Sequence, residues 1–188
     1  MMGLEETDAG AGATDFCRLR PLRPSDAAAL AALAGDLEVA RMTARVPHPY
    51  GVAEAERFLA GLGEAEVALG VEIGAGEAAE LAGVAGWKRD PAGAQAASGD
   101  VGYWLGRAFW GRGLATTAGR LLVEEAARDP ALTELRACVF QDNPASARVL
   151  EKIGFTYVGV CKGWSEARGR TDPTWLYRRA APEREGAR

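Results

Sequence analysis

The sequence predicts one α/β (α+β) domain built on a mixed β-sheet with flanking helices. Two observations carry this prediction: strand-like and helix-like apolar patterns are interspersed along the chain, and 188 residues suffice for one domain with a hydrophobic core. A composition of 48% hydrophobic and 26% charged residues agrees with a globular protein. The expected order is strand, helices, several strands, helix, strand, helix and strands, which differs from a doubly wound repeat.

The first strand is expected over 16–23, where apolar and basic residues alternate. Pro24 then interrupts the pattern, and Ser25 or Asp26 can cap a helix that ends at Ala34. Apolar residues at helical spacing predict further helices at 37–42, 52–62, 113–127 and 144–153. The remaining apolar runs predict strands at 66–73, 81–88, 100–106, 134–140, 155–162 and 173–179, with loops at 74–80 and 90–99.

The two ends of the chain differ from the domain between them. Residues 1–15 are rich in Gly, Ala and acidic residues, which predicts a disordered lead and not a signal peptide. The folded domain is expected over 16–180, followed by a flexible tail at 181–188. No apolar run approaches the roughly 20 residues that a membrane helix needs, so we expect no membrane partner.

Charge and cysteine content exclude several classes of function. The net charge is −4 and the basic residues are dispersed, which argues against nucleic acid as a partner. Cys17, Cys138 and Cys161 lie far apart, and His48 is the only histidine. We therefore expect no metal site and no disulfide framework, and the natural compartment is a reducing cytoplasm.

The segment 106–118 combines a glycine-rich turn with the start of an amphipathic helix. No Ser, Thr, Asp or Asn occupies the expected cap, and the first turn carries Arg112 where the helix dipole favours an anion. Gly111 and Gly113 let a ligand approach the free amides, so this helix start is suited to a pyrophosphate. The alternative is a plain glycine-rich turn capped by water. The GxGxxG and Walker patterns both fail here, because Thr116 replaces a required glycine and Gly-Lys-Ser/Thr is absent.

A second helix start follows the strand at 134–140. Asn143 is a good N-cap, Pro144 suits the first helical position and Gly154 suits the C-terminal stop. Helical spacing places Ser146 on the face of the apolar residues Val149, Leu150 and Ile153. Ser146 is therefore either a functional hydroxyl that points inward or a partner in the helix cap.

With both segments in view, the sequence resembles the GNAT N-acetyltransferase superfamily, most closely its RimJ/RimL-type branch. Residues 110–115 match the acyl-CoA loop, with Trp110 in place of its first polar residue. Asn143 to Ser146, together with Leu150 to Phe155, match the second family segment. The resemblance covers about residues 16–180, and its two long motifs occur in the right order.

The resemblance implies a mixed, mostly antiparallel twisted sheet flanked by helices, in which a splayed parallel strand pair holds acyl-CoA. The splayed strands would be 100–106 and 134–140, and acetyl-CoA would be the co-substrate. The implied donor-binding residues are Leu105, Trp110, Gly111, Arg112, Gly113, Leu114, Ala115, Thr116, Asn143 and Ser146.

The implied reaction is direct attack of an amine on the thioester, which requires orientation of the amine and a group that accepts its proton. Leu150 stands where many members of the family carry a tyrosine that acts as the general acid. The resemblance to the RimJ/RimL-type branch suggests that Ser146 takes over this role. Candidate bases are Asp100, which opens the splayed strand, and Glu166, next to the residue aligned with a catalytic glutamate of the branch. For each carboxylate, the alternative is a solvated surface charge.

The acceptor would be a protein N-terminus or a small-molecule amine. Candidate lining residues on the acceptor side are Arg45, His48, Tyr50, Trp87, Tyr103 and Trp164. A non-catalytic module that binds acyl-CoA as a sensor or scaffold is the alternative function, and a homodimer is the default oligomeric state.

Overall fold

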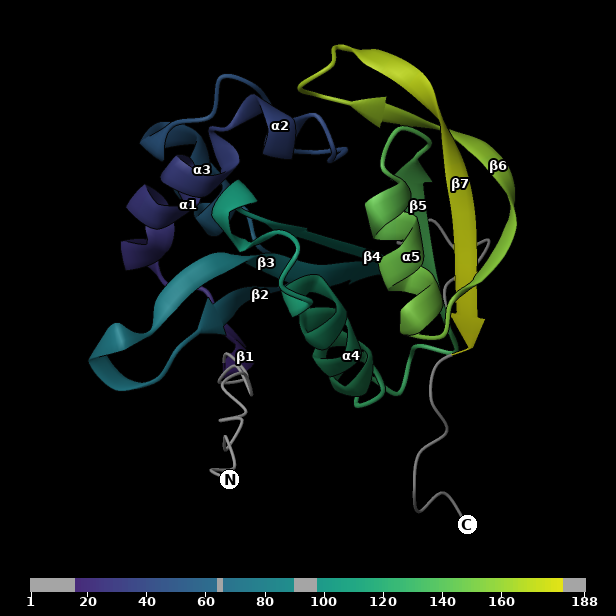
Figure 1. Cartoon of the computed structure of the whole chain (residues 1–188), viewed down its shortest axis with the longest axis horizontal. Helices are drawn as coiled ribbons and strands as arrows, with labels where there is room; N and C mark the ends of the chain where they lie inside the picture. Colours follow the sequence, from purple (N-terminus) through teal and green to yellow (C-terminus); the bar gives the residue numbers. More distant parts are fainter. Residues whose placement is uncertain (1–15, 64–65, 90–97, 181–188) are drawn as a thin grey trace, which may run out of the picture.

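The computed structural model describes residues 16–63, 66–89 and 98–180. The expected lead at 1–15, the tail at 181–188 and most of the expected loop at 90–99 lie outside these residues. The described chain forms a sheet of seven strands with helices on both faces (Figure 1). None of its helices is long and apolar enough to cross a membrane.

The strands are ordered β1-β2-β3-β4-β5-β7-β6. All neighbours pair antiparallel except β4 and β5, which are parallel. The strands are β1 (Cys17–Pro21), β2 (Glu66–Ile73), β3 (Glu80–Arg89), β4 (Ser98–Leu105), β5 (Glu134–Phe140), β6 (Thr156–Ser165) and β7 (Arg170–Ala180). The prediction of a mixed, mostly antiparallel sheet is confirmed.

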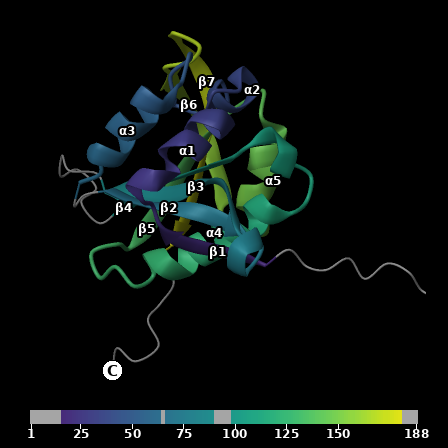
Figure 2. The same ribbon diagram turned by 90° about the vertical axis from the view of Figure 1, so that its left-hand side faces the viewer.

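Helices cover both faces of the sheet (Figure 2). The helices are α1 (Ala27–Ala34), α2 (Leu37–Ala40), α3 (Val52–Ala60), α4 (Leu114–Ala126) and α5 (Pro144–Lys152). In one core cluster, α1 and α3 pack on alternate residues of the sheet, among them Ala68, Val84 and Trp104. In the larger cluster, α4 and α5 pack on the opposite face, which includes Val101 and Leu135.

The predicted elements agree with the structure except at their ends. β4 begins at Ser98, two residues before the expected strand, and α3 stops at Ala60. The strands β6 and β7 form a hairpin with a short turn at 166–169, so both strands extend further toward the turn than the expected 155–162 and 173–179.

Asp26 caps the short 3-10 turn Pro24–Asp26 that leads into α1, and not the first turn of α1 itself. Asp26 stands at the N-cap position of α1, but its side chain makes no capping hydrogen bond there. Its carboxylate instead accepts hydrogen bonds from the Arg23 amide at 2.7 Å and from Arg20 at 2.8 Å. The charge of Arg20 thus holds the side chain away from the helix.

Candidate functional site

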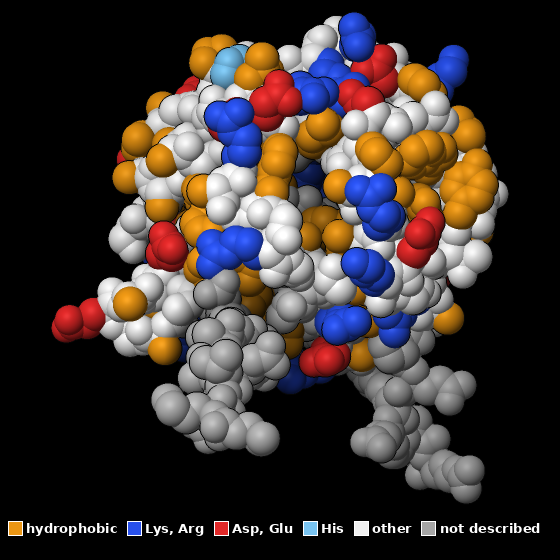
Figure 3. Space-filling model, viewed as in Figure 1, with side chains coloured by type: hydrophobic (Ala, Val, Ile, Leu, Met, Phe, Trp, Pro, Cys, Tyr) orange, Lys and Arg blue, Asp and Glu red, His pale blue; other side chains and the backbone are white. Residues whose placement is uncertain are grey.

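A cleft opens where β4 and β5 separate. The two strands pair only from Ser98 to Asp100 on β4 and from Glu134 to Arg136 on β5. Beyond this point β4 stays paired with β3, and β5 stays paired with β7. A cavity of about 1200 Å³ occupies the gap and continues between the flanking helices. The space-filling view is hollowed at its centre, with basic side chains around the opening (Figure 3).

The splay leaves backbone groups of β4 without a strand partner on one side. The Gly106 amide donates to the Ala82 carbonyl at 2.9 Å, toward β3. Because hydrogen-bonding direction alternates along an antiparallel strand, Val101, Tyr103 and Leu105 direct their amides and carbonyls toward the gap. These groups can pair with an extended ligand that contains amides.

Trp110 occupies one of these backbone groups at the C-terminal end of β4. Its indole Nε1 donates to the Leu105 carbonyl at 2.8 Å, so that carbonyl is already occupied. The predicted donor-binding residue Trp110 therefore braces the loop against the end of β4, and the Leu105 amide is the group of that residue left facing the cleft.

The start of α4 lies at the cleft and is open to an anion. Gly111 and Gly113 have φ values of 76° and 77°, a left-handed conformation that favours glycine. A Cβ on either glycine would meet no atom within 4 Å, so the space beside them is free. No side chain caps the helix, and the amides of Leu114 and Ala115 precede the first intrahelical bond. The Thr116 amide already donates to the Gly113 carbonyl at 2.9 Å.

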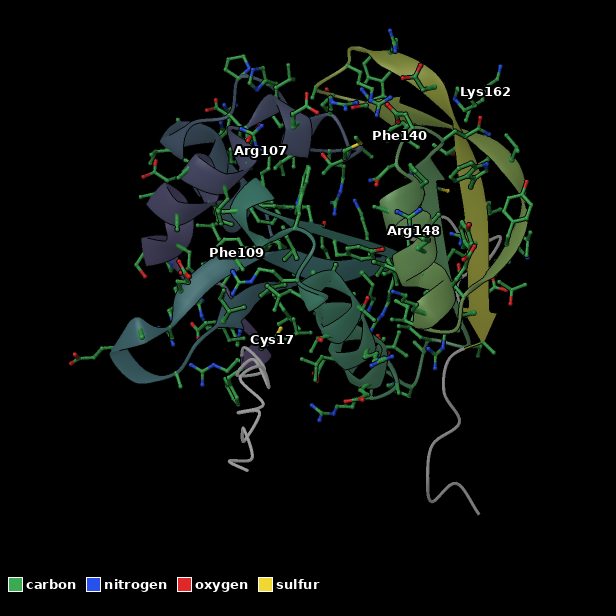
Figure 4. All side chains as sticks on the ribbon, in the orientation of Figure 1. Cys17, Arg107, Phe109, Phe140, Arg148 and Lys162 are labelled. Carbon is green, nitrogen blue, oxygen red and sulfur yellow. The ribbon has the colours of Figure 1, made fainter. Side chains whose placement is uncertain are left out.

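Basic side chains of α5 border the same part of the cavity, whereas Arg112, a predicted donor-binding residue, is not among the residues that line it. The Arg112 guanidinium lies 5.8 Å from the centre of the Phe109 ring. Arg148 and Lys152, four residues apart on α5, both line the cavity, and Arg148 is visible in Figure 4. The sequence reasoning missed these two residues, although their helical spacing was a signal that could have found them.

Ser146 forms a hydroxyl pair with Tyr103 across the cleft. The Asn143 side chain caps α5 by accepting a hydrogen bond from the Ser146 amide at 3.1 Å, as expected for this N-cap. The Tyr103 hydroxyl lies 3.0 Å from Ser146 Oγ and donates to the Ser146 carbonyl at 3.1 Å. Burial raises the pKa of Tyr103 to about 12, although the hydrogen bond with Ser146 acts in the opposite direction. The pair is therefore neutral and able to donate a hydrogen bond.

Of the two candidate bases, the structure brings only Asp100 to the cavity. Asp100 occupies the last paired position of β4 opposite Arg136, whose Nε lies 3.0 Å from the Asp100 carboxylate. Glu166 is exposed in the β6–β7 turn and does not line the cavity. Its amide donates to the Ala44 carbonyl at 3.0 Å, which ties the turn to the loop after α2 and leaves the side chain outside.

Of the residues predicted to line the acceptor side, some line the cavity and others lie outside it. Arg45, Tyr50 and Tyr103 line the cavity, whereas His48 is exposed outside it. Trp87 is 5% exposed in the core against α4, and Trp164 is 49% exposed on β6. Lining residues that the sequence reasoning missed include Phe58, Val84 and Trp104. Within the described ranges, no group of three or more His, Cys, Asp or Glu side chains could hold a metal ion.

Comparison with known proteins places this geometry in a family. The family described as "Acetyltransferase (GNAT) domain" matches residues 17–156. A Bacillus licheniformis relative, "Uncharacterized N-acetyltransferase p20", is 28% identical over 78 residues, which are 42% of this chain and 44% of that protein. The matches thus span less than half the length of the curated relatives.

Solved structures share the fold over most of the chain. Mycobacterium smegmatis RimJ in complex with CoA-disulfide has a TM-score of 0.76 at 23% identity, covering 89% of this chain and 83% of its own. Spermidine N-acetyltransferase from Vibrio cholerae, in complex with CoA and spermine, has a TM-score of 0.73 at 18% identity, covering 88% and 95%. Sequence match, sheet order and splayed strands agree, and the chain belongs to the acetyltransferase (GNAT) family.

Proposed function

We propose that the protein is an N-acetyltransferase that moves an acetyl group from acetyl-CoA to a primary amine. The single observation that carries the proposal is the splayed β4–β5 cleft that ends at the uncapped start of α4. Related folds were solved with acetyl-CoA and AMP, with CoA-disulfide and with CoA and spermine, according to their descriptions.

The chain's own groups fit a CoA donor. The amides at Leu114 and Ala115, with the open glycines before them, suit the pyrophosphate. Arg148 and Lys152 add positive charge beside it. The Val101 carbonyl and the backbone amide and carbonyl of Tyr103 lie beyond the last β4–β5 pair, and they suit the amides of the pantetheine arm, which would lie along β4 as an extra strand. Asn143 holds the start of α5 in place at the same cleft.

The proposed reaction forms a bond between the amine nitrogen and the acetyl carbon while the bond from that carbon to sulfur breaks. The amine loses a proton and the departing thiolate takes one. The hydroxyls of Ser146 and Tyr103 are placed to hydrogen-bond the departing sulfur, since both lie at the cleft and are neutral. Asp100, at the fork of the strands, is the proposed acceptor of the amine proton through water.

Thermal melting with acetyl-CoA, CoA, ATP and NAD at equal concentrations tests the donor site. We expect an upward shift only with the CoA species, because a ligand present at 100 times its Kd stabilises the folded state by about 2.7 kcal/mol. Release of free thiol in the presence of amine mixtures then tests transfer. No shift with CoA would contradict the donor site.

A second candidate function is a non-catalytic module that binds acyl-CoA as a sensor or scaffold. It is favoured by Leu150, an apolar residue that stands where many members of the family carry a tyrosine acting as the general acid. This candidate predicts a melting shift with CoA and no thiol release with any amine. A cytoplasmic location and a homodimer stay predictions from the sequence.

A further inference from the structure

The cavity has a floor of small residues on the face of the sheet that packs toward α1 and α3. Ala68 on β2, Gly86 on β3 and Gly102 on β4 are paired with one another in register, and all three line the cavity. Strand alternation places Gly102 on the same face as Trp104, which packs in the core cluster of α1 and α3. Residues at directly opposite positions share a face, so the whole row lies there.

Gly102 is the position of this floor that leaves space for a ligand. A Cβ on Gly102 would meet no described atom within 4 Å, and its φ is not positive. Gly86 differs, because a Cβ there would collide with the Val67 carbonyl oxygen of the neighbouring strand. The close approach of β2 thus accounts for glycine at 86, whereas the backbone would accept a larger residue at 102. The missing side chain at 102 leaves the floor open to the cavity.

The walls above this floor are apolar and largely aromatic. Tyr50, which precedes α3, Phe58 on α3 and Trp104 on β4 line the cavity and also pack on the core cluster of α1 and α3. All three are only partly buried, so each presents some of its ring to the cavity. Val84, the partner of Trp104 on β3, is 6% exposed and lines the cavity as well. An apolar group between these walls and the floor would be removed from water, which favours its binding.

The carboxylates that line the cavity in the described ranges each form an ion pair with arginine. The pairs are Glu54 with Arg57, Glu66 with Arg45, Asp100 with Arg136, and Asp142 with both Arg41 and Arg168. A second ammonium group on an acceptor would therefore have to displace an arginine to bind a carboxylate. These walls suit an amine whose other atoms are apolar better than they suit a polyamine.

The floor ends at the gap between β4 and β5. The row beside it on the same face holds Glu66, Lys88 and Asp100, and Asp100 is the last residue of β4 that pairs with β5. Gly102 is the next residue of β4 on this face, so the sheet is already open beside it. A group that rests on the floor therefore lies next to the gap proposed for the thioester, on the same face as the proposed base Asp100.

We propose that the acceptor is a primary amine that carries a bulky apolar group, and that this group packs on the floor beside Gly102 while the amine enters the gap. Tyr50, Phe58 and Trp104 cover the group. This inference rests on the proposed acetyltransferase function and names the substrate class of the same site. Such a group can belong to a small amine or to the first side chain of a peptide.

Acetylation of matched amines tests the proposal. Thiol release is measured with 2-phenylethylamine and with 2-methoxyethylamine, two amines of similar basicity of which only the first has an apolar ring. The peptide amides Phe-Ala-Ala and Ser-Ala-Ala form a second pair, and spermidine represents polyamines. We expect kcat/KM to be about tenfold higher for the apolar member of a pair, the effect of burying a ring-sized apolar group. A preference within the small-amine pair identifies a small molecule, and one confined to the peptide pair identifies a peptide amino-terminus.

Variants assign the preference to the floor. The side chain of Gly102→Leu would fill the space beside Gly102 without backbone strain, so the preference for the apolar amine should fall about tenfold. Gly102→Ala should show a smaller fall in the same direction, and it decides the question if Gly102→Leu does not fold. Gly63→Leu is the matched control and should keep the preference. Gly63 is exposed, has no positive φ and has open space at its Cβ, but it does not line the cavity.

Three results would each overturn the proposal. They are equal kcat/KM values within both pairs, a preference for spermidine over 2-phenylethylamine and the Phe peptide, and an unchanged preference in the Gly102 variants.

A binding measurement separates this proposal from the proposed function. Absence of thiol release with every amine would contradict the acetyltransferase function. In that case N-acetyl-2-phenylethylamine and N-acetyl-2-methoxyethylamine are titrated by calorimetry into the protein, with and without CoA. Tighter binding of the phenyl compound that is lost in Gly102→Leu supports the apolar site, and equal binding of the two compounds overturns it.

Discussion

The guanidinium of Arg168, in the β6–β7 turn, lies 2.8 Å from the carboxylate of Asp142, which directly precedes the N-cap of α5. The same guanidinium donates to the Arg41 carbonyl at 2.6 Å and lies 4.3 Å from the centre of the Phe140 ring. One side chain thus joins the turn, the end of α2 and the end of β5. Burial opposes ionisation of Asp142, but the hydrogen bond and charge of Arg168 outweigh it and lower the pKa of that carboxyl.

Arg168→Met is expected to loosen the acceptor side of the cleft. Arg168 is only 10% exposed, but Asp142 is 47% exposed and keeps its ion pair with Arg41, so no buried charge is left unpaired and we expect the lost hydrogen bonds and packing to cost about 1–2 kcal/mol. We expect a lower free energy of unfolding in urea together with a higher KM for the amine. Arg168→Lys should restore little, since an ammonium cannot reproduce the planar fork.

Arg170→Met is the matched control for that variant. Arg170 forms an ion pair with Asp172 at 2.9 Å, but its side chain is 69% exposed. Exposed ion pairs contribute about 0–1 kcal/mol to stability. Equal losses of stability in the two variants, or an unchanged amine KM in Arg168→Met, would show that Arg168 does not organise the cleft.

Gly113→Glu is expected to abolish CoA binding. The new carboxylate would stand beside the amides that suit the pyrophosphate, and it would repel the phosphates. Gly76→Glu is a matched control, because Gly76 also has a positive φ, 61° compared with 77° at Gly113, and open space at its Cβ. Both variants carry the backbone strain, but only Gly113→Glu should lose the melting shift with CoA. Retained CoA affinity would rule out the α4 start as the donor site.

Tyr103→Phe and Ser146→Ala are each expected to lower kcat more than donor affinity. Loss of a positioned proton donor typically reduces the rate by about 10²-fold. Because the two hydroxyls lie 3.0 Å apart, we expect the double variant to lose little more than either single variant. Independent, multiplying effects in steady-state kinetics would show that the hydroxyls do not act together.

The raised pKa of Tyr103 predicts how the reaction rate depends on pH. Because burial raises it to about 12, the phenol stays protonated through the neutral and mildly alkaline range. The rate should therefore show no alkaline decline caused by Tyr103 until the pH approaches that value. A decline near pH 10 that disappears in Tyr103→Phe would contradict a buried, neutral hydroxyl.

Much of the fold was predictable because its signals are local. Alternation, helical spacing, the Asn143 cap and the glycines at 111 and 113 belong to short segments, and each prediction based on them placed an element or a turn correctly. The ion pair of Asp26 with Arg20 was not predicted, because Arg20 lies on another element, β1.

The site was less predictable because it depends on strand register. Nothing in the sequence places Lys88 between Glu66 and Asp100, or the Tyr103 hydroxyl beside Ser146, until the strands are paired. Glu166 was misplaced for a related reason: a hydrogen bond from its amide to Ala44, far away in sequence, determines where the turn lies. Contacts between distant segments are what a local pattern cannot supply.

Glu72→Gln is expected to weaken the fold and to flatten its response to acid. Glu72 is 6% exposed and accepts hydrogen bonds from both Arg18 and Arg20. Its hydrogen bond with Arg20 is the largest factor that lowers the pKa of Glu72. Because the folded-state pKa is lowered, this stabilisation is complete above the unfolded-state value of about 4.3 and is lost as the pH falls through the folded-state pKa.

Urea denaturation at neutral pH and at successively lower pH values measures both effects. At pH 7 the variant should lose about 2 kcal/mol, the usual contribution of hydrogen bonds to a charged group. On acidification the wild-type protein should lose more stability than the variant, which has no carboxylate to protonate at this position. Glu124→Gln, an exposed change on α4, should alter stability by no more than about 0.5 kcal/mol. Parallel pH profiles for wild type and Glu72→Gln would show that this ion pair does not contribute to the acid response.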